Sequence, residues 1–112
     1  PDVAAYADVA PGGLAYWIRF DGKDWLTGGT SSSAPLWAAL IARLNQGLKR
    51  NLGFVNPVLY RMNSAGITSL NVGSNAMPSG PKKWSAQDGW DPCTGLGIPN
   101  GAKILRWLKA NN

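Results

Sequence analysis

Hydrophobic and polar residues follow two different periods along this 112-residue chain. Between residues 14 and 27, the runs LAYWIRF and DWLT flank Asp21-Gly22-Lys23. An Asp-Gly pair between runs rich in aromatic and β-branched residues is typical of a tight turn, so this stretch predicts a β-hairpin. The shorter apolar run from Val3 to Tyr6 predicts a buried strand, closed by a turn that includes Pro11, Gly12 and Gly13.

Helical periodicity begins at Pro35. Apolar residues of the stretch Pro35 to Leu48 recur with the spacing of one helical stripe, at Leu36, Leu40, Ile41 and Leu44. Asn56-Pro57 predicts a second, short helix with an Asn cap and a proline in its first turn. Pro99 to Ala110 predicts a last amphipathic helix with basic residues toward its C-terminus. Turn-forming residues dominate 63–97, and a long irregular stretch of this kind is usually functional or stabilised by an ion.

The order strand, hairpin, helix, short helix, loop and helix predicts an α/β fold. It fits the edge of an α/β sheet better than a freestanding domain, because too few strands are present to bury the tryptophans on both faces of a sheet. A chain of this length holds at most one hydrophobic core. Pro1-Asp2 is neither an initiator methionine nor the start of a signal peptide, so we expect a cut N-terminus.

Composition narrows the class of protein. Apolar residues make up 45% of the chain and charged residues 15%, which is typical of a globular protein. The net charge of +5 raises the question of a nucleic-acid partner. The basic residues Lys103, Arg106 and Lys109, however, recur at helical spacing, as on a solvated helix face. The sequence also has no zinc or RNA-binding motif, so we predict no nucleic-acid partner. No apolar run approaches the roughly 20 residues that cross a membrane, and Cys93, the sole cysteine, cannot form an intrachain disulfide.

The string TGGTSSSAPLWAAL places three serines between two glycines and an apolar helix. The unpaired N–H groups of a first helical turn can stabilise an oxyanion beside a hydroxyl at that point. A serine N-cap, which stabilises a helix by about 1 kcal/mol, is the simpler interpretation. The chain contains no histidine and no glutamate to act as a base. Lys23 and Lys49 are poorly placed, since Lys49 lies about 27 Å from Ser31 along a continuous helix.

Gly29-Thr30-Ser31, with Pro35 four residues after the serine, resembles the nucleophile motif of the subtilisin-like serine peptidases. Within that group the chain is similar to the sedolisins, also called serine-carboxyl peptidases. The strings PDVAAYAD, ARLNQGL, GFVNPVLY and GWDPCTGLGIPNG extend the similarity over nearly all 112 residues, in the family's order. The resemblance implies that residues 1–112 are the C-terminal segment of a single sedolisin-type peptidase domain with a subtilisin-like parallel-sheet fold. This segment would comprise a β-hairpin, the nucleophile helix, a calcium loop and the terminal helix.

The resemblance also implies a function for Ser31. In sedolisins the serine's base is a glutamate oriented by an aspartate, and a further aspartate completes the oxyanion hole. Those acidic residues would lie upstream of Pro1, so the isolated chain is predicted to be inactive, because a serine at its ordinary pKa is a weak nucleophile. The parent would be a secreted, extracellular, acid-active endopeptidase. The implied partners are the remainder of its catalytic domain, a polypeptide substrate and a propeptide, with no membrane.

Sedolisins also hold one structural calcium ion, and the resemblance transfers its ligands to five positions. They are the Asp91 carboxylate, the carbonyls of Gln87 and Gly89, and Ser69-Leu70. The family has Asp where this chain has Ser69, and a neutral hydroxyl there would lower calcium affinity, which Asp88 could offset in part. Judged from the residues alone, Asp88-Gly89 and Asp91-Pro92 are ordinary turn dipeptides.

Two functions therefore remain open. The first is the segment of a serine-carboxyl endopeptidase that carries the nucleophile, which the intact motif around Ser31 favours. The alternative is a non-catalytic relative or fragment that acts as a calcium-stabilised structural or interaction module. Ser69 and the lack of an upstream half favour this second interpretation.

Overall fold

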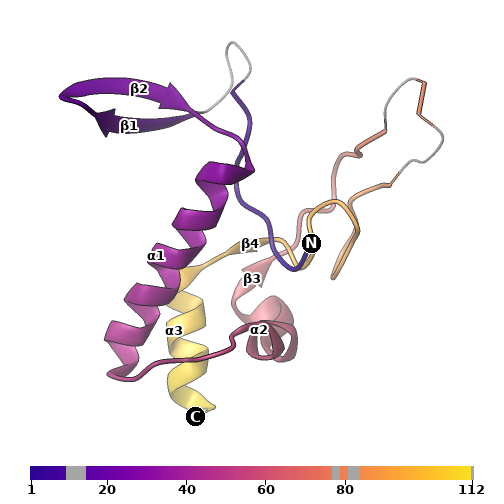
Figure 1. The fold of residues 1–112 in the computed structure, drawn as a ribbon. Coiled ribbons are helices and arrows are strands. Elements are labelled where there is room, and N and C mark those ends of the chain that lie inside the picture. Colours follow the sequence, from indigo (N-terminus) through magenta and orange to yellow (C-terminus); the bar gives the residue numbers. More distant parts are fainter. Residues whose placement is uncertain (10–14, 77–78, 81–83, 112) are drawn as a thin grey trace.

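The computed structural model describes residues 1–9, 15–76, 79–80 and 84–111 (Figure 1). Three helices and two small sheets make up this α/β part of the chain. The elements, in chain order, are β1 (Tyr16–Phe20), β2 (Lys23–Thr27), α1 (Thr30–Leu48), α2 (Asn56–Met62), the short 3-10 helix η1 (Asn63–Ala65), β3 (Ile67–Thr68), β4 (Ile98–Pro99) and α3 (Gly101–Ala110).

The predicted hairpin is confirmed. β1 pairs antiparallel with β2, with Tyr16 opposite Thr27 and Phe20 opposite Lys23. Asp21 and Gly22 both have positive φ angles, 50° and 70°, as a two-residue type I′ turn requires. The hairpin extends away from the helices in Figure 1. The predicted turn at Pro11, Gly12 and Gly13 lies outside the described residues.

The three predicted helices are confirmed, but their starts differ from the prediction. α1 begins at Thr30, so the three serines lie in its first turns and Pro35 lies inside the helix. The predicted Asn56 cap is wrong, since Asn56 is already helical and Val55 precedes it without a side-chain cap. α3 begins at Gly101, after Pro99 in β4, and its true cap is Asn100, whose side chain accepts a hydrogen bond from the backbone N–H of Lys103.

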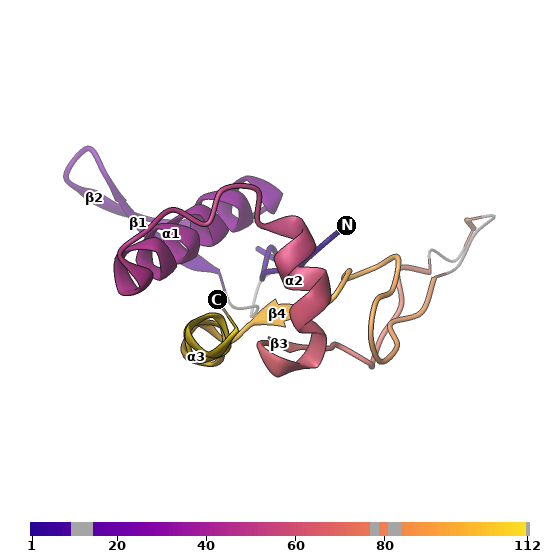
Figure 2. The same ribbon diagram turned by 90° about the horizontal axis from the view of Figure 1, so that it is seen from below.

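Two small clusters form the core. α1 packs beside α3, with Leu44, Ile104 and Leu108 buried together and Met62 of α2 against them (Figures 1 and 2). The second cluster consists of Leu59, Ile67 and Leu96. It joins α2 to the two short strands β3 and β4, and thereby to the long loop between them.

The predicted strand from Val3 to Tyr6 is wrong, because residues 1–9 form no strand. The segment is extended, but each of its sides contacts a different part of the molecule: Ala4 donates a backbone hydrogen bond to Gly97, and Ala7 accepts one from Gly29. Both sheets in the described ranges are antiparallel. The parallel sheet of a subtilisin-like fold therefore stays a prediction.

The described part of the molecule is flat, measuring 47 × 41 × 20 Å with a radius of gyration of 15.9 Å. A compact domain of 100 residues has a radius of gyration of about 13 Å. Large apolar side chains consequently face solvent, including Trp17 at 73% and Phe20 at 68% exposure. No helix in the described ranges combines the length and apolar character needed to cross a bilayer.

Candidate active site

The first turn of α1 is reached through a backbone conformation open to glycine alone. Gly29, at the N-cap position, has φ 86° and ψ 164°, a region that side-chain-bearing residues almost never adopt. Ser31 is the second residue of the helix and is exposed. In the described residues its hydroxyl has no hydrogen-bond partner, which leaves the oxygen accessible for chemistry.

The neighbouring serines have different contacts. Ser32 donates its hydroxyl hydrogen bond to the carbonyl of Gly28 at 3.1 Å, and Ser33 donates to the carbonyl of Tyr6 at 3.0 Å. Neither bond is an N-cap, and no side chain caps the start of α1. The capping interpretation of the three serines is therefore wrong, because the helix begins before them, at Thr30.

A surface pocket of about 590 Å³ lies between the hairpin and the start of α1. Ser31 lines it, together with Ser32, Gly28, Thr27 and a set of mainly apolar side chains: Tyr16, Trp17, Ile18, Pro35, Leu36 and Ala39. The pocket can therefore hold an apolar group next to an accessible hydroxyl.

The lysines considered as bases lie at the far ends of their elements. Lys23 begins β2 beside the hairpin turn and pairs with Phe20, whereas Ser31 follows the opposite end of that strand. Lys49 follows the last residue of the 19-residue α1. A Ser-Lys pair therefore has no support in the described part of the chain.

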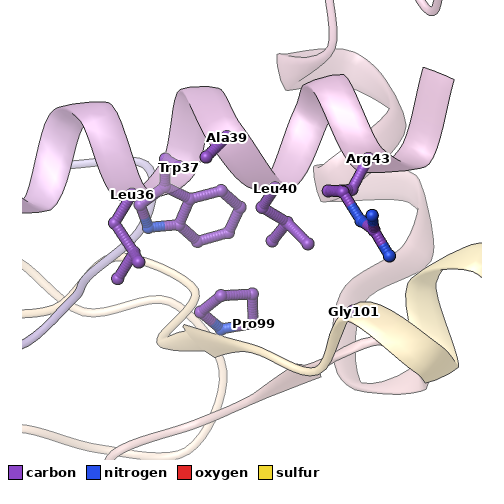
Figure 3. Close-up of a pocket in the computed structure, with 7 residues that line it drawn as sticks. All are labelled: Leu36, Trp37, Ala39, Leu40, Arg43, Pro99 and Gly101. Atoms are coloured by element: carbon purple, nitrogen blue, oxygen red, sulfur yellow. The ribbon is translucent and has the colours of Figure 1, made fainter. Parts of the chain in front are cut away.

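A second pocket, of about 330 Å³, runs along α1 opposite β4 and the start of α3 (Figure 3). Leu36, Trp37 and Leu40 form its apolar wall, Arg43 lies at one end, and Pro99 lies across from them. None of its lining residues is a nucleophile or an acid, so this pocket offers a packing surface rather than chemistry.

The Asp91 carboxylate, predicted as a calcium ligand, is completely buried. Its Oδ1 accepts hydrogen bonds from the backbone N–H groups of Cys93 and Thr94, at 2.7 and 2.8 Å. Its Oδ2 accepts the Thr94 hydroxyl at 2.7 Å and, more weakly, the N–H of Gln87 at 3.4 Å. These bonds hold the pKa of Asp91 below its ordinary value, and the bond from the Thr94 hydroxyl has the largest effect. Burial acts in the opposite direction, since it disfavours the charged form.

The other predicted ligands lie in two further places. The Ser69 hydroxyl accepts a hydrogen bond from the N–H of Gly89 at 3.1 Å, and nearby Asn71 donates to the Asp88 carboxylate at 3.0 Å. Leu70 lines an apolar pocket. The described residues contain no group of three or more acidic, histidine or cysteine side chains that could hold a metal ion.

This arrangement does not fit a calcium ion. A carboxylate offers about four acceptor positions, and Asp91 uses four for hydrogen bonds from its own chain. An ion would have to displace donors from a buried group, and Ser69 supplies no compensating charge. The calcium site stays a prediction, and no step of the chemistry depends on it.

Sequence reasoning missed the Thr94 hydroxyl. An aspartate followed three residues later by threonine often forms hydrogen bonds between its side-chain oxygens and nearby backbone and hydroxyl groups. The sequence pattern could therefore have indicated the Asp91–Thr94 hydrogen bond. Two further contacts join positions far apart in the sequence, and no local pattern indicates them. The Tyr60 hydroxyl donates to Asp2 at 2.8 Å, and the Trp90 indole donates to the carbonyl of Pro1 at 2.9 Å.

Comparison with known proteins finds relatives along almost the whole chain. Kumamolisin from Bacillus sp. (strain MN-32) is 44% identical over 108 residues, which cover 96% of this chain and 19% of kumamolisin. Tripeptidyl-peptidase SED1 of Arthroderma otae is 43% identical over 105 residues, 89% of this chain and 15% of that protein. Aorsin of Aspergillus oryzae is 40% identical over 108 residues, 92% of this chain and 16% of aorsin. No protein-family model matches the chain.

These similarities show that the segment is related to the sedolisin-type serine-carboxyl peptidases. The segment is kumamolisin-like over almost its whole length, which agrees with the sedolisin resemblance of its motifs. It spans about a fifth or less of the length of the curated relatives it matches.

Proposed function

We propose that this chain supplies the nucleophilic serine of a sedolisin-type serine-carboxyl endopeptidase. The observation that carries the proposal is the Ser31 hydroxyl, exposed at a pocket in the first turn of α1, within a sequence that matches peptidases. Ser32 and Ser33 donate to backbone carbonyls, so Ser31 is the serine of this cluster left accessible for attack.

In the proposed reaction, the Ser31 oxygen attacks the scissile carbonyl, the peptide C–N bond breaks and the amine product leaves with a proton. Water then hydrolyses the acyl-enzyme ester, which releases the second product and restores the serine. N–H groups of the first helical turn lie beside the hydroxyl and favour the developing negative charge. The sedolisin resemblance assigns the proton to a glutamate base, and this chain, which has no histidine and no glutamate, would receive that base from the rest of the catalytic domain. A carboxylate base is ionised in mildly acidic solution, so acid activity follows from this chemistry.

The remainder of the catalytic domain is the proposed partner of this segment. The described part is thin, and Trp17, Phe20, Trp25 and Leu26 are each more than half exposed on the hairpin. The register places Trp17 and Leu26 on one face of the hairpin and Phe20 and Trp25 on the other. Large apolar side chains gathered in this way on one element usually meet another protein surface. The secreted location and the propeptide remain parts of the same proposal, drawn from the family.

The second candidate function is a non-catalytic structural or interaction module. It is favoured by Ser69, which stands where the family has an aspartate, and by the loop around Asp91, which is held by its own hydrogen bonds. This candidate predicts that Ser31 never reacts, even when the upstream part of a peptidase is supplied.

A chimera separates the two candidates. The matching segment of kumamolisin would be replaced by residues 1–112, and the purified protein tested for peptide cleavage at acidic pH and for labelling by a fluorophosphonate probe. We expect cleavage and labelling, both lost in Ser31→Ala. Ser64→Ala, which removes an exposed hydroxyl in η1, is the matched control and should retain both.

A folded chimera that binds substrate but is not labelled would contradict the nucleophile proposal and favour the non-catalytic module. Labelling that persists in Ser31→Ala would show that another residue reacts. The isolated 112-residue chain should be neither labelled nor active, because the general base is absent from it.

A further inference from the structure

Residues 1–7 lie between the start of α1 and the loop that contains Asp91, and they form hydrogen bonds with both. We call these seven residues the strap. We propose that the strap couples the Asp91 turn to the first turn of α1, which makes Asp91 a positioning residue for Ser31. The importance of that position rests on the proposed function, whereas the coupling itself can be measured without any peptidase activity.

Three hydrogen bonds join the strap to α1. The backbone N–H of Gly29 donates to the carbonyl of Ala7 at 2.6 Å. Ser33 donates its hydroxyl to Tyr6 at 3.0 Å, and the Trp37 indole donates to Ala4 at 3.1 Å. These donors lie before, within and after the turn that carries Ser31, so the strap fixes both the direction and the start of the helix.

The close approach of the strap to the chain before α1 explains why position 28, the first of the Gly28-Gly29 pair, is a glycine. A Cβ atom at Gly28 would lie 2.9 Å from the carbonyl oxygen of Ala7 and 3.0 Å from that of Asp8, and it would overlap the Val9 side chain. Such distances are shorter than normal van der Waals contact. Any side chain at position 28 would therefore push the strap away from α1.

The other side of the strap contacts residues 90–97. Leu96 donates its backbone N–H to Asp2 at 2.8 Å, and Ala4 donates to Gly97 at 2.9 Å. A Cβ atom at Gly95 would come within 2.5 Å of the Asp2 carbonyl group, so these backbones are in direct contact. The Trp90 indole and the Tyr60 hydroxyl add side-chain bonds to Pro1 and Asp2.

Asp91 holds this second surface in place. Its backbone exchanges two hydrogen bonds with Gly95, at 3.0 and 2.9 Å, while its carboxylate binds the N–H groups of Cys93 and Thr94. The turn thus sets where Gly95 to Gly97 lie against the strap. Hydrogen bonds join Asp91 to Gly95, Leu96 to Asp2 and Gly29 to Ala7, and the covalent backbone connects these bonds in between.

The first test measures amide hydrogen exchange by NMR on the 112-residue chain. Asp91→Asn weakens the turn, and we expect the Gly29 amide to exchange about three- to tenfold faster, the effect of losing one net hydrogen bond. The Gly29 amide proton should also shift upfield, because its bond to Ala7 lengthens. Asp88→Asn is the matched control, since it removes a charge from the same loop but not the Gly95 contact, and it should leave Gly29 unchanged.

The second test works in the opposite direction, since coupling between two sites is reciprocal. Ser33→Ala removes the hydroxyl bond to Tyr6 and should speed exchange at the Leu96 amide. Ser33→Thr keeps a hydroxyl and should restore the protection. The Ile104 amide in α3, bonded to Asn100 at 2.9 Å, reports global unfolding in every variant.

The proposal is overturned if Asp91→Asn speeds hydrogen exchange at the Cys93 and Thr94 amides while the Gly29 amide exchanges as slowly as before. If Asp91→Asn also speeds exchange at the Ile104 amide, the chain has unfolded globally. The comparison of Ser33→Ala with Ser33→Thr then tests the coupling. Unchanged Leu96 exchange in Ser33→Ala then refutes the coupling. Both results differ from failure of the proposed function, which is absence of Ser31 labelling in a folded chimera.

Discussion

Gly29→Ala tests why the chain turns into α1 through a glycine. The φ of 86° and ψ of 164° lie in a region that costs about 1–3 kcal/mol for a residue with a Cβ atom. In the described residues, no atom apart from those of the two chain neighbours lies within 4 Å of the position that the alanine Cβ would take, so the penalty is backbone strain and not overlap. At about 4 °C per kcal/mol in a domain of this size, Tm should fall by about 4–12 °C.

The assay is thermal unfolding followed by circular dichroism on the 112-residue chain. Gly47→Ala is the control, because this helical glycine gains helix propensity of about 1 kcal/mol on substitution. The new Cβ would press only on the Leu105 side chain, at 3.0 and 3.1 Å. A Tm for Gly29→Ala that equals or exceeds that of Gly47→Ala would refute the strain argument. In the chimera, Gly29→Ala should also slow fluorophosphonate labelling, since the first turn of α1 must shift.

Two further predictions concern Asp91. Because its carboxylate already accepts four hydrogen bonds, we expect no rise in Tm on adding calcium at millimolar concentration. A rise in Tm that Asp91→Ala abolishes would show that calcium binds there and would contradict our geometric argument. The lowered pKa of Asp91 means that its ionised form stabilises the fold above the unfolded pKa of about 3.9, and that this stabilisation is lost as the pH falls through the lower folded pKa. Tm measured from pH 6 downward should therefore decline less steeply in Asp91→Asn than in the parent chain, and parallel profiles would contradict this assignment.

Local patterns predicted the elements that depend on neighbours in the sequence. Asp21-Gly22 specified the hairpin because a type I′ turn needs two positive φ angles, and the structure has both. The stripe through Leu40 and Leu44 predicted α1 because these residues pack against the core or lie in it. The nucleophile role of Ser31 stays a prediction from the motif around it, and the structure adds that Ser31 is exposed and lines a pocket.

What was not predicted depends on particular contacts, some distant in sequence and some local to a turn or a helix start. Val3 to Tyr6 has the composition of a strand, but each of its sides meets a different partner, so no ladder forms. The Asn56 cap failed because Val55 already occupies the N-cap position. The ion-ligand role of Asp91 stays a prediction from the family pattern, and what the sequence reasoning did not anticipate is that Thr94 and local backbone N–H groups bind its carboxylate.

The strap has a consequence for the order of folding. Trp90 and Pro1 are 89 residues apart in sequence, and Tyr60 and Asp2 are 58 apart. Closing such long loops carries an entropic cost that is recovered only once the remaining structure exists, so contacts of this kind form late. The hairpin and helices can therefore assemble while the surroundings of Ser31 are incomplete, and the first turn of α1 would reach its final position among the last steps of folding.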